Sequence, residues 1–169
     1  MILVWFRRDL RTLDHTALKA ALDTGQPVVA CFVATPEQWQ EHHMAPMQAD
    51  LIASRLEHVH QELTELNIPL LYKEVPHFDD CTKVICDWAD KLNATAVMVN
   101  INYEVNEVEL DRKVAQVLDN RGVEFHAFHD KCVHAPTTVL NKQGEYFKVF
   151  TPFKRAWLQK FSLPTVSKP

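Results

Sequence analysis

The sequence predicts an α/β fold in which helices cover both faces of a parallel β-sheet. Short apolar runs alternate along the chain with segments whose apolar residues recur at helical spacing. This alternation is typical of β-α-β units, in which right-handed crossovers join neighbouring parallel strands. The chain has 169 residues, of which 47% are hydrophobic, so it can bury the core of one domain. We therefore expect a doubly wound sheet, with five strands along the chain.

The first strand and helix are the most clearly marked elements. Ile2–Phe6 is a continuous apolar run, as expected for a strand that is covered on both faces. Asp14 can act as the N-cap of a helix from about His15 to Thr24, which Gly25 would end. The inward positions of this helix are expected to be Leu18, Ala21 and Leu22.

A long amphipathic helix is expected between the second and third strands. These strands are the runs at residues 27–34 and 70–74, and the helix covers residues 46–67. Its expected core positions are Leu51, Ile52, Leu56, Val59, Leu63 and Leu66.

Residues 79–128 repeat the helix–strand pattern twice. A helix that begins at Asp79 or Asp80 precedes a strand at residues 94–100, and a helix over residues 107–120 precedes a strand at residues 123–128. The expected core positions are Val84, Ile85, Trp88, Ala89 and Leu92 in the first helix, and Val114, Val117 and Leu118 in the second.

The C-terminal part departs from this pattern. Residues 130–144 read as irregular chain, and Thr151-Pro152 predicts the start of a last helix, because proline is favoured at the first helical position. Residues 162–169 contain two prolines and no apolar face. We therefore expect one domain over residues 1–161, followed by the start of an interdomain linker at residues 162–169.

The net charge and the distribution of apolar residues indicate whether the chain could bind nucleic acid or a membrane. The 18 basic and 22 acidic residues give a formal charge of −4, whereas a domain that grips DNA by itself usually carries a basic surplus. No apolar run approaches the roughly 20 residues that span a bilayer, and the N-terminus lacks the features of a signal peptide. We expect no membrane partner, and any DNA contact to come mostly from sequence outside this chain.

The spacing of the cysteine, histidine and glycine residues argues against several kinds of binding site. The four cysteines lack CxxC spacing and the nine histidines lack a convergent set of ligands, so we expect a cytoplasmic protein without a disulfide or a bound transition metal. Cys31 is expected to be a small buried hydrophobic residue. The three glycines form neither GxGxxG nor a phosphate-binding loop, which argues against NAD or ATP binding.

Asn106, Glu107 and the histidines of one loop are the candidate ligand-binding residues. Asn106 suits an N-cap with Glu109 three residues on, and an acidic Glu107 suits the first turn of a helix. His42 and His43 follow Trp39 in the loop after the second strand. From the residues alone, a helix cap and an ordinary surface loop are the favoured interpretation, and a ligand site is the alternative.

Three unusual strings of aromatic and charged residues occur in order: VWFRRDLR at residues 4–11, YEVNE at 103–107 and YFKVFTPFKRAW at 146–157. Together they resemble the N-terminal domain of the DNA photolyase/cryptochrome family, and in particular the folate-antenna type of cyclobutane-pyrimidine-dimer photolyases. The resemblance runs from Leu3 to about Phe161. It implies a Rossmann-like sheet of order 3-2-1-4-5, with its ligand crevice at the switch point between strands one and four.

The resemblance also implies cofactors and site residues. Asn106 and Glu107 match the pair that contacts 5,10-methenyltetrahydrofolate, and alignment through Trp39 selects His42, with His43 adjacent. FAD, the catalytic residues and the damaged DNA would then belong to a helical domain absent from this chain. The implied activity is light-driven repair of cyclobutane pyrimidine dimers by a monomeric photolyase, and this chain alone should be inactive.

Several alternatives remain open. One alternative is a cryptochrome, which shares this domain. A second, from another class, is an adenine-nucleotide-binding subunit of the electron-transfer-flavoprotein or universal-stress type. A third is a structural domain that has lost its antenna. Arg7, Arg8 and Arg11 suit a local ion-pair network, a domain interface or the anionic tail of a ligand. Where the family usually has Asp-Asn, this chain has Asp14-His15, a departure expected to have little consequence.

Overall fold

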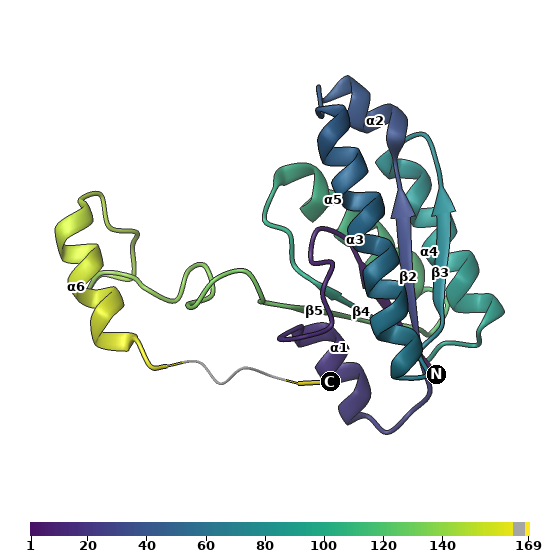
Figure 1. Cartoon of the computed structure of the whole chain (residues 1–169). Coiled ribbons are helices and arrows are strands. Elements are labelled where there is room, and N and C mark those ends of the chain that lie inside the picture. Colours follow the sequence, from purple (N-terminus) through teal and green to yellow (C-terminus); the bar gives the residue numbers. More distant parts are fainter. Residues whose placement is uncertain (164–167) are drawn as a thin grey trace.

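The computed structural model describes residues 1–163 and 168–169 and contains a five-stranded parallel sheet. Its strands are β1 (Ile2–Phe6), β2 (Val28–Ala34), β3 (Leu70–Glu74), β4 (Ala96–Asn100) and β5 (Glu124–Phe128). They lie in the order β3-β2-β1-β4-β5, and every neighbouring pair is parallel (Figure 1). The predicted fold class and strand order are confirmed.

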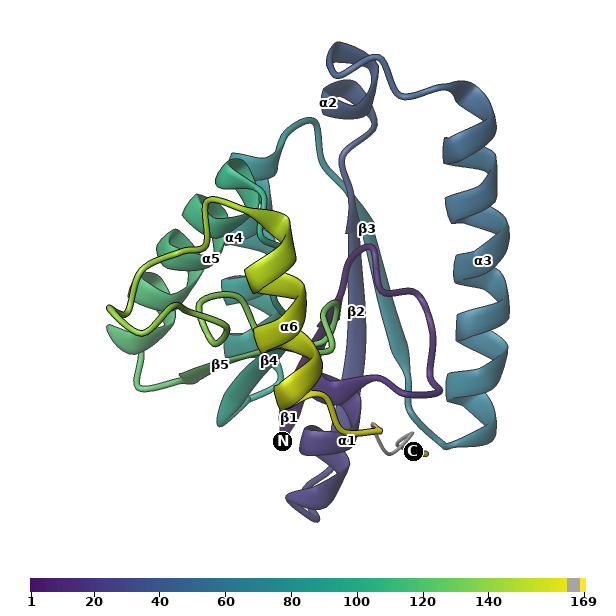
Figure 2. The same cartoon turned by 90° about the vertical axis from the view of Figure 1, so that its left-hand side faces the viewer.

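Helices cover both faces of the sheet. Helices α1 (Thr16–Asp23) and α3 (Pro46–Glu65) lie on one face, and α4 (Phe78–Lys91) and α5 (Val105–Asp119) lie on the other (Figures 1 and 2). The central strand β1 is buried at every position and alternates between the two cores, with Leu3 and Trp5 facing α4 and α5. Ile2, Val4 and Phe6 face α1 and α3. Burial on both faces explains why β1 reads as an uninterrupted apolar run.

The core positions predicted for the helices are confirmed except at two places in α3. Val59 and Leu63 are fully buried, whereas Leu51 is 68% exposed and Leu66 is also exposed. Successive helical residues lie about 100° apart, so Leu51 cannot share the inward stripe that Ile52 occupies. Leu66 is the C-cap, outside the helix proper.

A short helix that the sequence did not predict, α2 (Pro36–Glu41), follows β2. Thr35 is its N-cap and Pro36 its first residue, where the missing N–H of proline has no cost. His42 is the C-cap of this helix and His43 has a positive φ of 55°. Both histidines therefore lie at a helix end, and not in the open loop that the sequence suggested.

Helix α1 begins one residue later than predicted, and its cap is His15 instead of Asp14. Asp14 has a φ of 53°, and the Nδ1 atom of His15 accepts the backbone N–H of Leu18 at 3.0 Å. His15 is buried, and its Nε2 lies 2.9 Å from Asp9 Oδ2. This side chain joins the helix start to the loop after β1, and the expected small consequence of the Asp14-His15 departure stays a prediction.

The C-terminal segment extends away from the sheet and ends in helix α6 (Phe150–Lys160), as Figure 1 shows. The helix starts at Phe150, so Pro152 is its third residue and not its first; the N–H of that position also lacks an intrahelical partner. No residue of α6 is buried. Of the predicted linker, residues 164–167 lie outside the described residues, so the domain boundary stays a prediction.

None of the described helices combines the length and the apolar character needed to cross a membrane.

Candidate functional site

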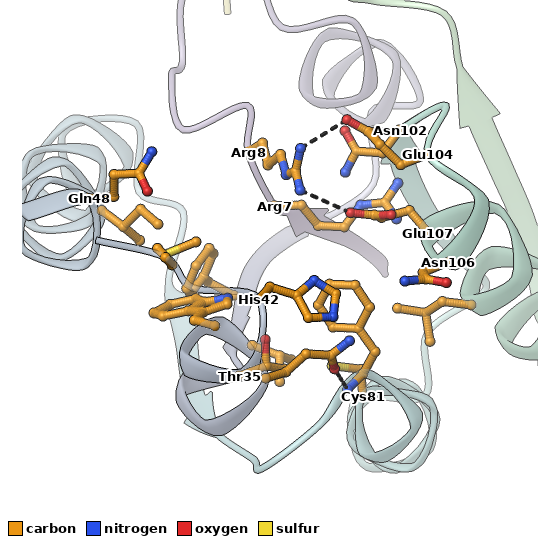
Figure 3. A pocket seen from close by; sticks show the side chains of 18 of the residues that line it. Arg7, Arg8, Thr35, His42, Gln48, Cys81, Asn102, Glu104, Asn106 and Glu107 are labelled. Atoms are coloured by element: carbon orange, nitrogen blue, oxygen red, sulfur yellow. Dashed lines mark hydrogen bonds and ion pairs between the residues drawn. The ribbon is translucent and has the colours of Figure 1, made fainter. Parts of the chain in front are cut away.

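A cavity of about 580 Å³ opens at the carboxyl ends of β1, β2 and β4. Its walls come from α2, α3, α4 and the first turns of α5, and Figure 3 shows the side chains that line it. Neighbouring strands β1 and β4 lead to helices on opposite faces, so the cavity lies at the switch point of the sheet, where α/β folds bind ligands.

Much of the cavity wall is aromatic or aliphatic. Trp5 and Phe32 come from the strands, Trp39 from α2, Phe78 from α4 and Leu110 from α5. Flat apolar side chains with a few polar groups between them are typical of a site for a planar organic ligand.

The candidate residues from the sequence come together in this cavity. Asn106, Glu107, His42 and His43 all line it, although they lie more than sixty residues apart in the chain (Figure 3). Their contact with a ligand stays a prediction. The predicted capping role of Asn106 is wrong, because α5 begins two residues earlier and Glu104 is its N-cap.

Glu107 is a carboxylate in the cavity wall and is only 6% exposed. Its Oε1 atom accepts a hydrogen bond from Arg8 Nη2 at 3.2 Å. Among the described residues, no hydrogen bond or ion pair reaches its second oxygen, Oε2. Oε2 is not one of the described buried polar atoms that lack a hydrogen-bond partner, so water or a ligand in the cavity can reach it. Spare accepting capacity of this kind suits a group that binds a ligand.

Asn102 is a site residue that the sequence did not single out. It follows β4, lies buried at 5% exposure and lines the cavity. None of the hydrogen bonds among the described residues involves its side-chain amide. Its place two residues beyond the inward-facing Asn100 was the available signal.

Arg8 is the one arginine of the N-terminal string that lines the cavity with its charge exposed. Its Nη1 donates to Glu104 Oε1 at 2.9 Å, beside the bond to Glu107. A backbone hydrogen bond within Glu104, with Lys131 and Arg8 nearby, lowers the pKa of Glu104, although burial opposes this shift. Glu104 therefore stays ionised.

Arg7 also lines the cavity, but its bonds are structural. Its guanidinium donates to both oxygens of Asp111, at 2.7 and 3.3 Å, and to the Asn100 carbonyl at 2.7 Å. Its charge lies 4.9 Å from the centre of the Trp5 ring. Burial raises the pKa of Asp111, against the opposing effect of Arg7. Arg7 thus joins β1, β4 and α5 behind the cavity wall.

Asp9, His15 and Asn100 form a second polar cluster on the other side of the loop after β1. Asp9 accepts hydrogen bonds from the Arg7 backbone N–H and Asn100 Nδ2, both at 2.8 Å. Asn100 Oδ1 accepts the N–H of Ala17 at 3.0 Å. Each group in this cluster has a partner inside the protein, so it fixes the loop and is not open to a ligand.

Arg11 belongs to the structural contacts as well. It donates to Asp130 at 2.5 Å, and Asp130 also accepts from the backbone and hydroxyl of Thr16. Burial raises the pKa of Asp130, but the Thr16 and Arg11 bonds outweigh it and hold the pKa below its usual value. Arg7 and Arg11 therefore form local ion pairs in this structure, whereas Arg8 lines the cavity.

A smaller hollow of about 340 Å³ adjoins the cavity and shares Asn106 with it. Its charged lining is mostly acidic, with Glu41, Asp79 and Glu109 against Lys113. Lys113 is already paired with Asp79 at 2.6 Å. An anionic group would be repelled there.

Within the part of the chain that the structure describes, no group of three histidine, cysteine or acidic side chains could hold a metal ion. Cys31, Cys81 and Cys86 are buried, Cys132 is exposed, and all four are free. Burial raises the pKa of the Cys81 thiol to about 12, so this thiol in the cavity wall is protonated.

Comparison with known proteins finds a matching family model and curated relatives. The family model described as DNA photolyase matches residues 2–169. The deoxyribodipyrimidine photo-lyase of Vibrio cholerae is 53% identical over 168 residues, which are 99% of this chain and 36% of the relative. That of Escherichia coli is 40% identical over 159 residues, covering 94% of this chain and 33% of the relative. The chain spans about a third of the length of these curated relatives.

Solved structures share the fold. A cryptochrome of Synechocystis sp. PCC6803 matches with a TM-score of 0.86 at 22% identity, covering 99% of this chain and 35% of that one. A bacterial class III photolyase of Agrobacterium tumefaciens matches with a TM-score of 0.76 at 25% identity, covering 99% and 33%. Because the family match extends over nearly the whole chain, this chain belongs to the DNA photolyase family.

Proposed function

We propose that this chain is the N-terminal, antenna-binding part of a deoxyribodipyrimidine photolyase that repairs cyclobutane pyrimidine dimers with light. The observation that carries the proposal is the buried, half-satisfied carboxylate of Glu107 in an aromatic cavity at the switch point. The relatives that bear the name deoxyribodipyrimidine photo-lyase support the parent activity.

The proposed ligand is a reduced folate, 5,10-methenyltetrahydrofolate. Its pterin ring presents a ring N–H and an exocyclic amine that point the same way, and a carboxylate accepts two such donors in parallel. Glu107 is the carboxylate that we assign to this edge, with Asn106 beside it and His42 on the opposite wall. The amide of Asn102, in the cavity wall, offers a further partner.

The residues present fit such a group. Trp39 and Phe78 provide flat surfaces for a planar ring, and the donor set of the ring matches the accepting oxygens of Glu107. When bound, the folate would absorb near-UV or blue light and pass the excitation on. The protein's part is to orient the ring and to exclude water from it.

The catalytic flavin and the DNA are assigned to sequence outside this chain. A charge of −4 offers little attraction to a phosphate backbone, so the intact protein should grip DNA and flip the dimer through its other part. Illumination of this chain alone with a dimer-containing oligonucleotide should leave the dimers intact.

A cryptochrome is the second candidate, because the structural match to one is close. The curated photolyase relatives, at 53% and 40% identity, favour repair. Light-dependent repair by the full-length protein separates the two functions, since a signalling receptor would leave the dimers in place.

The antenna site is tested by Glu107→Ala and Asn106→Ala in the full-length protein. Loss of a charged hydrogen bond in a partly buried site costs about 1.5–3 kcal/mol, or roughly tenfold to 150-fold in affinity. The near-UV antenna band should shrink, flavin content should stay constant, and repair should persist when the flavin is excited directly. Glu109→Ala on the same helix removes an equal charge from the adjoining hollow and is the control. A double variant that keeps full antenna occupancy would refute the site.

A further inference from the structure

Arg8 spans the mouth of the cavity between two carboxylates. Its two terminal nitrogens donate to Glu104 at 2.9 Å and to Glu107 at 3.2 Å, and both bonds are drawn in Figure 3. The Arg8 side chain is 60% exposed, whereas that of Glu107 is 8% exposed. A solvent-facing cation therefore covers one oxygen of a buried anion.

The two bonds of Arg8 are unequal. The bond to Glu104 is the shorter, and Glu104 also attracts Lys131, whose Nζ lies 3.4 Å from the same oxygen. The bond to Glu107 is longer and reaches Oε1 alone. Arg8 can therefore give up Glu107 and still keep a carboxylate partner.

Arg7 provides the contrast within the same loop. It holds both oxygens of Asp111 in a fork, and its side chain is only 10% exposed. Release of Arg7 would leave an unpaired charge in the core, which is strongly destabilising. Release of Arg8 returns its own charge to water, and the buried carboxylate of Glu107 keeps partners when the N–H donors of a ligand replace Arg8.

We propose that Arg8 is a displaceable latch on the antenna site. In the ligand-free protein it holds Glu107 Oε1, and a ligand with two parallel N–H donors takes both oxygens of Glu107 while Arg8 moves fully to Glu104. This inference rests on the proposed function, because it concerns the same carboxylate.

The latch has a consequence for specificity. A ligand with one donor can use Oε2 and leave Arg8 in place, so it gains one bond. A ligand with paired donors gains two charge-assisted bonds at the cost of one ion pair whose arginine is exposed to solvent. The arrangement therefore favours a guanidine-like edge over a single N–H donor.

The test compares dissociation constants for 5,10-methenyltetrahydrofolate in folate-free, full-length protein. Arg8→Gln removes the competitor and should bind about 2- to 5-fold more tightly, the range expected of one ion pair whose arginine is exposed. Glu104→Gln removes the alternative partner, leaves Arg8 on Glu107, and should bind about 2- to 5-fold more weakly. Arg121→Gln, which breaks the surface pair with Asp90 far from the cavity, is the matched control.

The double variant Arg8→Gln/Glu104→Gln gives the sharpest outcome. If Glu104 acts only by holding Arg8, the double variant should match Arg8→Gln, whereas independent effects would add. Additive effects, or unchanged or weaker binding by Arg8→Gln, would overturn the latch, because Arg8 would then not compete with the ligand.

A measurement without ligand separates the latch from the proposed function. Failure of the wild-type protein to bind folate would overturn the antenna assignment. The latch itself is tested by measuring, by NMR, the rate of hydrogen exchange at the Arg8 guanidinium. Glu107→Gln should speed that exchange, and an unchanged rate would overturn the latch whatever the ligand.

Discussion

Two polar clusters flank the loop after β1, and they differ in whether all of their polar groups have hydrogen-bond partners. His15 and Asn100 are buried, Asp9 is partly buried beside them, and hydrogen bonds between them and the backbone tie the loop to α1 and β4. Glu107, by contrast, keeps an oxygen without a partner among the described residues and shares Arg8 with an exposed neighbour. The first cluster is closed and stabilises the fold, whereas the second is open and is ready for a ligand.

The largest expected effect lies in the closed cluster. Asn100→Ala removes a donor to Asp9 and an acceptor for the Ala17 N–H, which leaves both groups buried without that partner. The free energy of unfolding should fall by about 2–4 kcal/mol. Urea denaturation measures this loss; a change below about 0.5 kcal/mol would mean that the cluster does not hold the loop.

Acid should weaken the same cluster. Burial raises the pKa of Asp9, but the hydrogen bond and charge of His15, with the Arg7 amide and Asn100, outweigh it and lower the pKa below its ordinary value. A carboxyl group with a lowered folded pKa adds stability above its unfolded pKa of about 3.9, and this stability is lost as the pH falls through the folded pKa.

Asp9→Asn should therefore lower the free energy of unfolding by about 2 kcal/mol at pH 7. The amide N–H₂ group of asparagine would face hydrogen-bond donors that now bind the carboxylate. The gap between wild type and variant should narrow below about pH 4, as the wild-type carboxyl takes up its proton. Denaturation at a series of pH values measures the gap. A gap that widens in acid would contradict the lowered pKa.

The smallest effect on stability is expected in the open cluster, at Asn106. If this residue were an N-cap, Asn106→Ala would cost about 1 kcal/mol. Because it lies in the first turn of α5 and is exposed, the free energy of unfolding should change by less than about 0.5 kcal/mol. A thermal melt beside a folate titration shows which role it has.

The sequence predicted the sheet well because its inner strands, β2, β1 and β4, are buried apolar runs, a pattern typical of strands that are covered on both faces. The bounds of β1 and β3 agree with the expected residues, and the others differ at one end only. Helix starts were harder, since Asp14 and Asn106 both suit an N-cap by residue type. The backbone passes through a positive φ at Asp14 and enters α5 before Asn106. Local composition does not encode those turns.

The residues of the candidate site were predicted from the sequence, but their hydrogen-bond and ion-pair partners were not. The strand ends and the family resemblance pointed to Asn106, Glu107 and His42, which do share a cavity. The partners of the arginines lie about a hundred residues away, as in the Arg7–Asp111 pair, so no spacing rule could assign them. Only the fold separates Arg7, which holds the core, from Arg8, which faces the cavity.

The most direct test of this account is the unfolding of Glu107→Gln, measured beside its affinity for 5,10-methenyltetrahydrofolate in the full-length protein. A residue reserved for a ligand should be dispensable for folding, since function and stability trade off at such sites. We predict a free energy of unfolding within about 0.5 kcal/mol of wild type, or higher, with at least a roughly tenfold loss of affinity. A variant that loses about 2 kcal/mol or more of stability and keeps its affinity would show that Glu107 belongs to the closed kind of cluster.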